Sequence, residues 1–156
     1  KARGHRPENA ITYYHLGLIE SATDNQSAAL SYYKQAIELD PEDHFSRNNL
    51  GHIYLMMEEL DQCIAVLKPT ADGNPKALLA QANIATAYLL KKQFALAETH
   101  FENVVASSPK DAINLAKLAW AEFEQNKTAE GNEHITQALI IAPDDQTVRF
   151  VNQKFQ

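Results

Sequence analysis

The prolines of this chain are regularly spaced. Five of the six are separated by 34 residues, namely Pro7, Pro41, Pro75, Pro109 and Pro143. A fixed period of this size indicates a stack of similar supersecondary units, each burying its apolar face against the next. We therefore expect four units, with a short segment on either side: 1–9, 10–43, 44–77, 78–111, 112–145 and 146–156.

Other positions repeat with the same period. The eighth position of each unit is very small and the twenty-fourth is large and apolar: Gly17, Gly51, Ala85 and Ala119, and Tyr33, Leu67, Phe101 and Ile135. A small residue lets two helices approach closely, so this pattern predicts that a large side chain of one helix fills a gap in its neighbour. Cys63, the one cysteine, is interpreted as a small buried apolar residue, since it cannot form a disulfide within the chain.

Each unit has two stretches of helical apolar spacing. Leu50, Ile53, Tyr54 and Met57 recur at intervals of three and four residues, and a polar turn such as 23–26 divides the stretches. The period proline disfavours helical geometry in the residue before it. The sequence therefore predicts two antiparallel helices per unit, with the second ending just before the proline.

These residues resemble the tetratricopeptide repeat over 10–145. The resemblance is carried by Leu50-Gly51 and Tyr54 in the second unit, and by Ala29, Tyr33, Ala36 and Pro41 in the first. It implies an all-α fold, a right-handed α-α superhelix (solenoid) of four helix pairs. The apolar stripe Val148, Val151 and Phe155 predicts a C-terminal capping helix over 146–156, with a truncated fifth unit as the alternative.

The beginning of the chain also follows the period. Ala2 falls where Ala36 falls, so 1–9 is interpreted as the end of a preceding repeat or as a tail. The basic residues Lys1, Arg3 and Arg6 are interpreted as a solvated end, in preference to a docking arm.

Pro69 lies off the period, within the second helix of the second unit. A proline there removes a backbone donor and clashes with the preceding turn, at about 3 kcal/mol or more in a helix interior. We expect the helix to end or kink near Lys68. Both a shortened helix and a hinge between the second and third units are consistent with this proline.

The resemblance assigns a concave binding groove to the first helices. Its groove-facing positions correspond to twelve candidates: Ile11, Tyr14, His15, Phe45, Asn48, Asn49, His52, Leu79, Asn83, Thr86, Lys117 and Trp120. Asn49 and Asn83 carry both donors and an acceptor for an extended peptide backbone, while Ile11, Phe45 and Leu79 contact its apolar side chains.

Each of these assignments has an alternative. The two asparagines are also suited to bridging neighbouring helices. The apolar row that includes Phe45, Leu79 and Ile113 would equally suit burial under a terminal helix or a neighbouring copy. Tyr14 and Trp120 suit the core or the rim better than the centre of a binding site.

Composition and motifs exclude several functions. Lys and Arg number 14 against 20 Asp and Glu, a net charge of −6, which argues against nucleic-acid binding. The apolar runs are too short for membrane insertion. No phosphate loop, His-Glu-x-x-His pair or nucleophile with partners occurs, so we expect no enzymatic activity, cofactor or metal. The charge pairs Asp144-Asp145 and Glu58-Glu59 are interpreted as solvated.

We therefore predict a non-catalytic scaffold that binds a protein or peptide partner in the groove. A self-associating structural array, and hence a homo-oligomer, is the first alternative. The recruiting arm of a larger enzyme or assembly complex is the second. Clamping of a chaperone's terminal carboxylate is disfavoured, because the basic pair that such repeats use is replaced by Leu79 with Asn83, or by Ile113 with Lys117.

Overall fold

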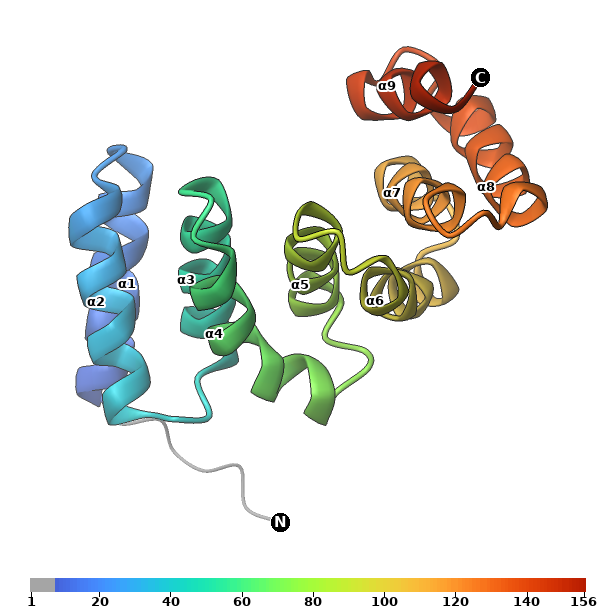
Figure 1. Ribbon diagram of the computed structural model, residues 1–156. Helices are drawn as coiled ribbons and strands as arrows, with labels where there is room; N and C mark the ends of the chain where they lie inside the picture. The colour runs from blue at the N-terminus through green and yellow to red at the C-terminus, as the bar shows by residue number, and fades with distance from the viewer. Residues whose placement is uncertain (1–7) are drawn as a thin grey trace. The chain divides into compact units, whose positions relative to one another are not determined.

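The computed structural model describes residues 8–156, which form nine α-helices joined by short turns (Figure 1). They are α1 (Glu8–Ala22), α2 (Gln26–Leu39), α3 (His44–Met56), α4 (Leu60–Gly73), α5 (Leu78–Leu90), α6 (Phe94–Ser107), α7 (Ala112–Phe123), α8 (Thr128–Ile141) and α9 (Gln146–Phe155). The all-α class, with four helix pairs and a terminal helix, is confirmed. The expectations for Ala2 and for the basic residues Lys1, Arg3 and Arg6 lie outside the described residues.

The 34-residue period recurs in the backbone. The second helices begin at Gln26, Leu60, Phe94 and Thr128 and end at Leu39, Gly73, Ser107 and Ile141. The turn inside each pair contains one residue in the left-handed region, with φ of 59° to 62°: Asp24, Glu58, Lys92 and Asn126. Asp and Asn tolerate this region better than Glu and Lys do. The turn geometry is therefore kept even where the residue type does not favour it.

Aspartates at the period begin three of the helices. The carboxylate of Asp43 accepts from the backbone N–H groups of Phe45 and Ser46, and that of Asp111 accepts from Asn114 N. Asp145 accepts from the first turn of α9, at 2.8 Å from Thr147 N. Such caps satisfy donors that a helix leaves unpaired. The prediction that Asp145 is a purely solvated charge is therefore wrong, since it caps a helix and is half-buried.

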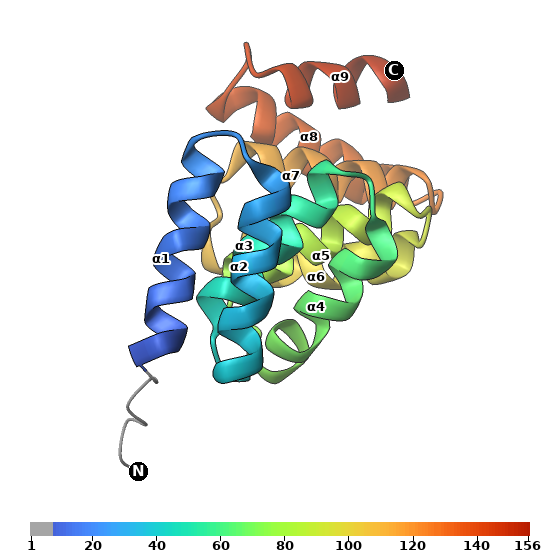
Figure 2. The same cartoon turned by 90° about the vertical axis from the view of Figure 1, so that its left-hand side faces the viewer.

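The chain divides into two compact units at the Thr70–Ala71 bond, inside α4. We call residues 8–70 the N-terminal unit and 71–156 the C-terminal unit. In the N-terminal unit α1 and α2 lie side by side and antiparallel, and α3 packs on α2 (Figures 1 and 2). A Cβ built at Gly17 would lie 2.6 Å from the Tyr33 ring, and one at Gly51 would lie 2.5 Å from Leu67 Cγ. Both glycines are thus needed for close helix approach, as the small and large positions of the sequence predict.

Pro69 does not end α4. The helix continues four residues beyond it to Gly73, the position at which the other second helices end. The residues after the proline are held from both sides. Thr70 Oγ1 lies 3.3 Å from His44 Nδ1, and Ala71 O accepts from Gln81 Nε2 at 2.7 Å. The helix therefore does not end near Lys68, and the alternative of a kink there stays a prediction.

The C-terminal unit has an alanine-rich core that α9 completes. Ala116 and Ala119 of α7 and Ala138 of α8 are fully buried, together with Val148 and Val151 of α9. The ring of Phe155 stacks on Phe123 with 4.8 Å between centroids. The apolar stripe of the terminal helix therefore covers the last helix pair, as predicted.

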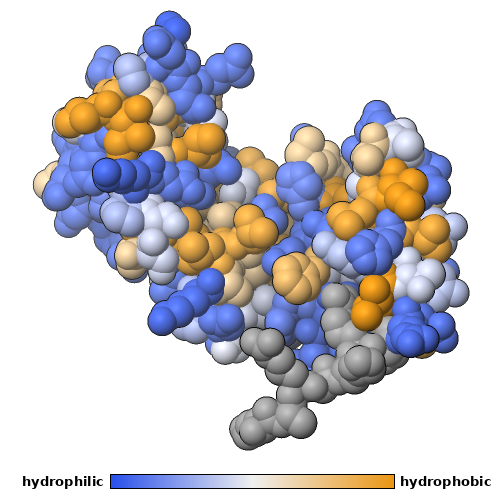
Figure 3. All heavy atoms as spheres, turned by 180° about the vertical axis from the view of Figure 1, so that it is seen from behind, coloured by the Kyte–Doolittle hydropathy of each residue, from blue (hydrophilic) through white to orange (hydrophobic). Residues whose placement is uncertain are grey.

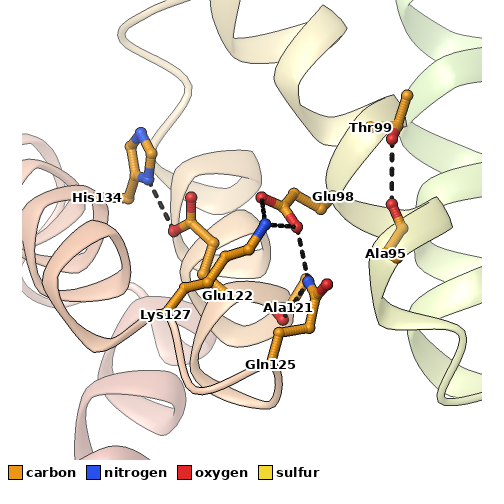
Figure 4. Close-up of polar contacts among 8 residues, drawn as sticks. All are labelled: Ala95, Glu98, Thr99, Ala121, Glu122, Gln125, Lys127 and His134. Atoms are coloured by element: carbon orange, nitrogen blue, oxygen red, sulfur yellow. Dashed lines mark hydrogen bonds and ion pairs between the residues drawn. The ribbon is translucent and has the colours of Figure 1, made fainter.

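Polar contacts link α6, α7 and α8 within this unit (Figure 4). Glu122 is buried, and its Oε2 lies 2.8 Å from His134 Nδ1. Burial raises the pKa of the Glu122 carboxyl, and the hydrogen bond from His134 opposes the rise. On α6, Glu98 accepts from Gln125 Nε2 at 2.7 Å and pairs with Lys127. These polar groups are hydrogen-bonded or ion-paired to one another. We therefore interpret them as contacts between helices and not as a binding site.

Candidate functional site

The first helices of the N-terminal unit carry a group of rings. Tyr14 of α1 lies 6.2 Å from Phe45 of α3 and 5.3 Å from His15, measured between ring centroids. Phe45 is 63% exposed, and His15 is exposed as well. We call the surface formed by Ile11, Tyr14, His15, Phe45, Asn48, Asn49 and His52 the N-terminal face. This face presents aromatic and imidazole groups, and the Tyr14 ring contacts those of His15 and Phe45.

A pocket of about 290 Å³ lies within this unit. It is lined by Leu18, Ser21, Asp24, Gln26, Tyr33, Asn49, His52, Ile53 and Met56. The Tyr33 hydroxyl is hydrogen-bonded to Asn49 and lies 3.3 Å from Ser21 Oγ. Burial raises the pKa of Tyr33, and these hydrogen bonds partly counteract it. The pocket is thus lined by both apolar and polar side chains, which suits an amphipathic group.

Two predicted groove asparagines of α3 differ in their environment. The Asn49 side chain is hydrogen-bonded to Tyr33 of α2 and also lines the pocket. Asn48 is half-buried, and its Oδ1 has no hydrogen-bond partner within 8–156. A buried acceptor without a partner is costly. It marks a place where a bound group could donate a hydrogen bond.

The first helices of the C-terminal unit carry aliphatic groups and one ammonium. Leu79 of α5 is 68% exposed and Ile113 of α7 is 41% exposed, while Asn83 and Thr86 are half-buried. Lys117 Nζ donates to Thr86 Oγ1 at 3.2 Å. We call the surface formed by Leu79, Asn83, Thr86, Ile113 and Lys117 the C-terminal face. Apolar patches interrupted by polar side chains are visible on both units in Figure 3.

Trp120 lies apart from this face, against the terminal helix. Its ring is 5.5 Å from that of Phe150 and 4.1 Å from Lys154 Nζ, and its Nε1 donates to Glu124. Lys154 also pairs with Glu124 at 2.7 Å, which lowers the pKa of that carboxyl. The structure therefore places Trp120 at the packing of α7 against α9.

Known sequences match the N-terminal part of the chain. Profiles described as tetratricopeptide repeat match residues 10–43 and 32–65. The Photosystem I assembly protein Ycf3 of Cyanophora paradoxa is 36% identical over 47 residues, which is 30% of this chain and 27% of that protein. The matched segment therefore spans about a quarter of that relative. The first profile match has the bounds expected for the first repeat, and the remaining unit bounds stay predictions.

Solved structures match nearly the whole chain. MamA (41-end) from Desulfovibrio magneticus RS-1 superposes with a TM-score of 0.85 at 21% identity, over 96% of this chain and 87% of that one. The APC/C hetero-tetramer Cut9–Hcn1 gives a TM-score of 0.79 at 17% identity, over 94% of this chain and 30% of that one. Residues 10–65 therefore match tetratricopeptide repeats, and the chain has the tetratricopeptide-repeat fold. At these identities the structures show the fold alone.

The tetratricopeptide repeats divide the twelve predicted groove residues between the two units. Seven lie on α1 and α3 and form the N-terminal face; Leu79, Asn83, Thr86 and Lys117 lie on α5 and α7, and Trp120 packs on α9. Phe45, Leu79 and Ile113 are exposed, so the terminal helix does not bury the apolar row. Whether these residues bind a partner stays a prediction.

Several residues of the tetratricopeptide surfaces were not predicted. Ser21 near the end of α1, Asp24 in the following turn and Gln26 at the start of α2 line the pocket of the N-terminal unit. The left-handed φ of Asp24 gives that turn its direction, and the recurrence of a polar turn with the 34-residue period is the signal that points to it. Phe150 against Trp120 had no comparable signal, because α9 follows the last complete repeat.

No helix within 8–156 is long and apolar enough to cross a membrane. Across the same residues no group of three His, Cys, Asp or Glu side chains is placed to hold a metal ion. The tetratricopeptide fold is typically non-catalytic and generally mediates protein–protein interactions. The two faces are therefore the candidate functional surfaces.

Proposed function

We propose that this protein is a non-catalytic scaffold that binds segments of partner proteins along its two first-helix faces. The observation that carries the proposal is the exposure of Phe45, Leu79 and Ile113, at equivalent positions of three repeats. Large apolar side chains that recur on one helix face, among polar groups able to fix a backbone, are typical of protein-binding surfaces.

The polar groups of the faces support the same function. In the N-terminal unit a pocket of about 290 Å³ lies beside Asn49 and His52 and can receive one side chain of a bound segment. In the C-terminal unit Asn83 and Lys117 offer donors. Two of the similar proteins, the Photosystem I assembly protein Ycf3 and the APC/C hetero-tetramer Cut9–Hcn1, are named for protein assemblies. A recruiting role within a larger complex is consistent with them.

Self-association is the second candidate, because the same exposed residues can also contact a second copy. Light scattering of the intact chain over a range of concentrations distinguishes the two. A dimer that is lost in Phe45→Glu would favour self-association. A monomer at all concentrations would favour a different protein as the partner.

Peptide display tests the proposed function. Random twelve-residue peptides, fused through their C-termini to a phage coat protein, are selected on the intact chain and resynthesised as C-terminal amides. We expect Phe45→Glu or Leu79→Glu to weaken the selected peptides roughly 30-fold or more, since each places a charge at an apolar contact. Ile140→Glu is the matched control, because Ile140 is an exposed apolar residue of a second helix.

The proposed function fails if Ile140→Glu weakens binding as much as the two face variants do. It also fails if no peptide is enriched over an unrelated helical protein. Circular dichroism of each variant verifies that the helices are retained, so that loss of binding is not loss of fold.

A further inference from the structure

Lys117 sets the charge of the C-terminal face. Helix α5 contains no charged residue, and α7 contains only Lys117 and Glu122. Glu122 is buried and hydrogen-bonded to His134 of α8, so its carboxylate is engaged within the second-helix packing. Lys117 is therefore the one formal charge that α5 and α7 offer to a molecule bound along this face.

The Lys117 ammonium has a neutral partner and no carboxylate partner. Its Nζ donates to Thr86 Oγ1, whose own proton is donated to Ala82 O at 2.8 Å. No carboxylate of residues 8–156 lies within 4.0 Å of this nitrogen, and Asp111 and Asp145 act on it only from farther away. Burial lowers the pKa of Lys117. A half-buried cation of this kind is stabilised when an anion joins it.

Asn83 supplies a second donor on the same helix as Thr86, the partner of this ammonium. It lies on α5 one turn before Thr86, about 4.5 Å along the helix axis, and is half-buried. Its side chain forms no hydrogen bond with any residue of 8–156, in contrast to Asn49 at the equivalent position of the second repeat. The Asn83 amide is therefore available to a ligand held by Lys117.

Apolar groups flank the two donors on both helices. Leu79 lies four residues before Asn83 on α5, so these two residues share a helix face. Ile113 lies four residues before Lys117 on α7, so the same holds for that pair. Both side chains are exposed. An apolar residue beside the bound anion would bury them.

We propose that the C-terminal face binds an aspartate or glutamate side chain of a partner segment, paired with Lys117 and hydrogen-bonded to Asn83, while neighbouring apolar residues of that segment contact Leu79 and Ile113. The inference rests on the proposed function and names the chemistry of the partner. Because Lys117 is already partly desolvated, forming the pair removes less water from it than a surface lysine would lose.

The N-terminal face does not have this preference. Helix α1 carries no Lys or Arg, and the Arg47 guanidinium of α3 donates to Pro41 O and Val66 O. Residues 8–70 contain 3 Lys and Arg against 10 Asp and Glu, whereas 71–156 contain 8 against 10. An acidic segment is therefore repelled by the first unit and selected by Lys117 in the second.

The experiment uses the peptides selected by display on the intact chain and on Lys117→Met. The displayed peptides have no free C-terminus, so a recovered carboxylate preference is that of a side chain. We expect Asp or Glu to be enriched at one position next to apolar residues on the wild-type chain, and this enrichment to disappear on Lys117→Met.

A double-mutant cycle then measures the pairing. One enriched peptide is synthesised with Glu and with Gln at that position, and both are titrated against wild type, Lys117→Met and Lys117→Arg. We expect Glu to bind roughly 30-fold or more tightly than Gln on wild type, and equally on Lys117→Met. Asn83→Asp should weaken the Glu peptide, and Asn132→Asp, which adds the same charge at an exposed position of the second helix α8, should have little effect.

Two outcomes overturn the inference. Peptides enriched in apolar residues alone, bound equally by wild type and Lys117→Met but weakened by Leu79→Glu, would refute the carboxylate pairing and leave the proposed function standing. A Glu preference that persists on Lys117→Met would place the acid elsewhere. If no peptide depends on Phe45 or Leu79, the proposed function itself fails.

Discussion

The two units share a helix-pair scaffold and differ in how their first helices are held and in what they present. In the N-terminal unit, glycines let Tyr33 and Leu67 pack closely, and rings gather around Tyr14. In the C-terminal unit, alanines occupy the equivalent close positions. Buried polar contacts from Gln81 to His100 and from Glu122 to His134 join the helices there.

This difference shows that the repeat determines where a side chain lies on its helix but not which chemical group stands there. The sixth position is His15, Asn49, Asn83 and Lys117 in the four repeats. Asn49 is engaged with Tyr33, Asn83 has no partner within 8–156, and Lys117 has a neutral one. Equivalent positions therefore range from structural to available for binding.

The largest effect is expected for Gly51→Leu. A Cβ at this position would lie 2.5 Å from Leu67 Cγ, so the added side chain must push α3 and α4 apart. We expect a loss of about 3 kcal/mol of unfolding free energy, with hydrogen-exchange protection lost in α1–α3 and kept in α7–α9. Gly73→Ala is the control, since nothing lies within 4 Å of its Cβ position. A stable Gly51→Leu would contradict the close approach in the N-terminal unit.

Glu122→Gln tests the polar interior of the C-terminal unit. Because burial raises the pKa of Glu122 in the fold, its ionisation opposes folding, and its contribution to stability is lost as pH rises through that raised pKa. We expect Glu122→Gln to be more stable than wild type by about 1 kcal/mol at pH 8. Urea unfolding should show the difference closing as pH falls below the ordinary range of Glu. A variant less stable than wild type at pH 8 would instead show that the ionised pair with His134 stabilises the unit.

Lys117→Met separates binding from stability. The pKa of Lys117 is lowered by burial, so its ionised form opposes folding at neutral pH and this penalty fades as pH rises towards the lysine range. We expect the variant to be more stable by about 1 kcal/mol at pH 7, in the thermal and urea transitions alike. If Lys117→Met is more stable than wild type and no longer binds the acidic peptide, the role of Lys117 is in binding and not in stabilising the fold. A destabilised variant would mean that Lys117 holds α5 to α7 through Thr86.

The smallest changes in unfolding free energy are expected for alanine substitutions of the two asparagines, Asn49 and Asn83. Asn49→Ala removes the hydrogen bond to buried Tyr33 and should cost about 1 kcal/mol, while Asn83→Ala removes none and should change stability by less than about 0.5 kcal/mol. Urea unfolding of both variants measures this. Equal losses would mean that Asn83 is as structural as Asn49.

The fold follows from the sequence because its main constraint is periodic. Prolines, small positions and large positions each recur every 34 residues, and the second helices begin and end at that interval. Pro69 does not end α4, and residues beyond it make tertiary contacts. Thr70 and Ala71 beyond it are held by His44 and Gln81, 26 and 10 residues away.

The site was predicted less completely, for a similar reason. Periodicity places a residue on a helix but does not say which neighbour its polar group meets. It put Asn49 and Asn83 on equivalent surfaces, yet only the structure connects Asn49 to Tyr33. The contact between buried Glu122 and His134 does not recur with the 34-residue period, so the repeat pattern could not predict it.

Mapping of backbone amide shifts by nuclear magnetic resonance, during titration with a display-selected peptide, tests the central claim most directly. If partner segments bind along the first-helix faces, the shifts will concentrate in α1 and α3 or in α5 and α7, and an acidic peptide will shift the surroundings of Asn83 and Lys117. Shifts concentrated in α2, α6 and α8 would contradict the account, because they would place the partner on the second helices.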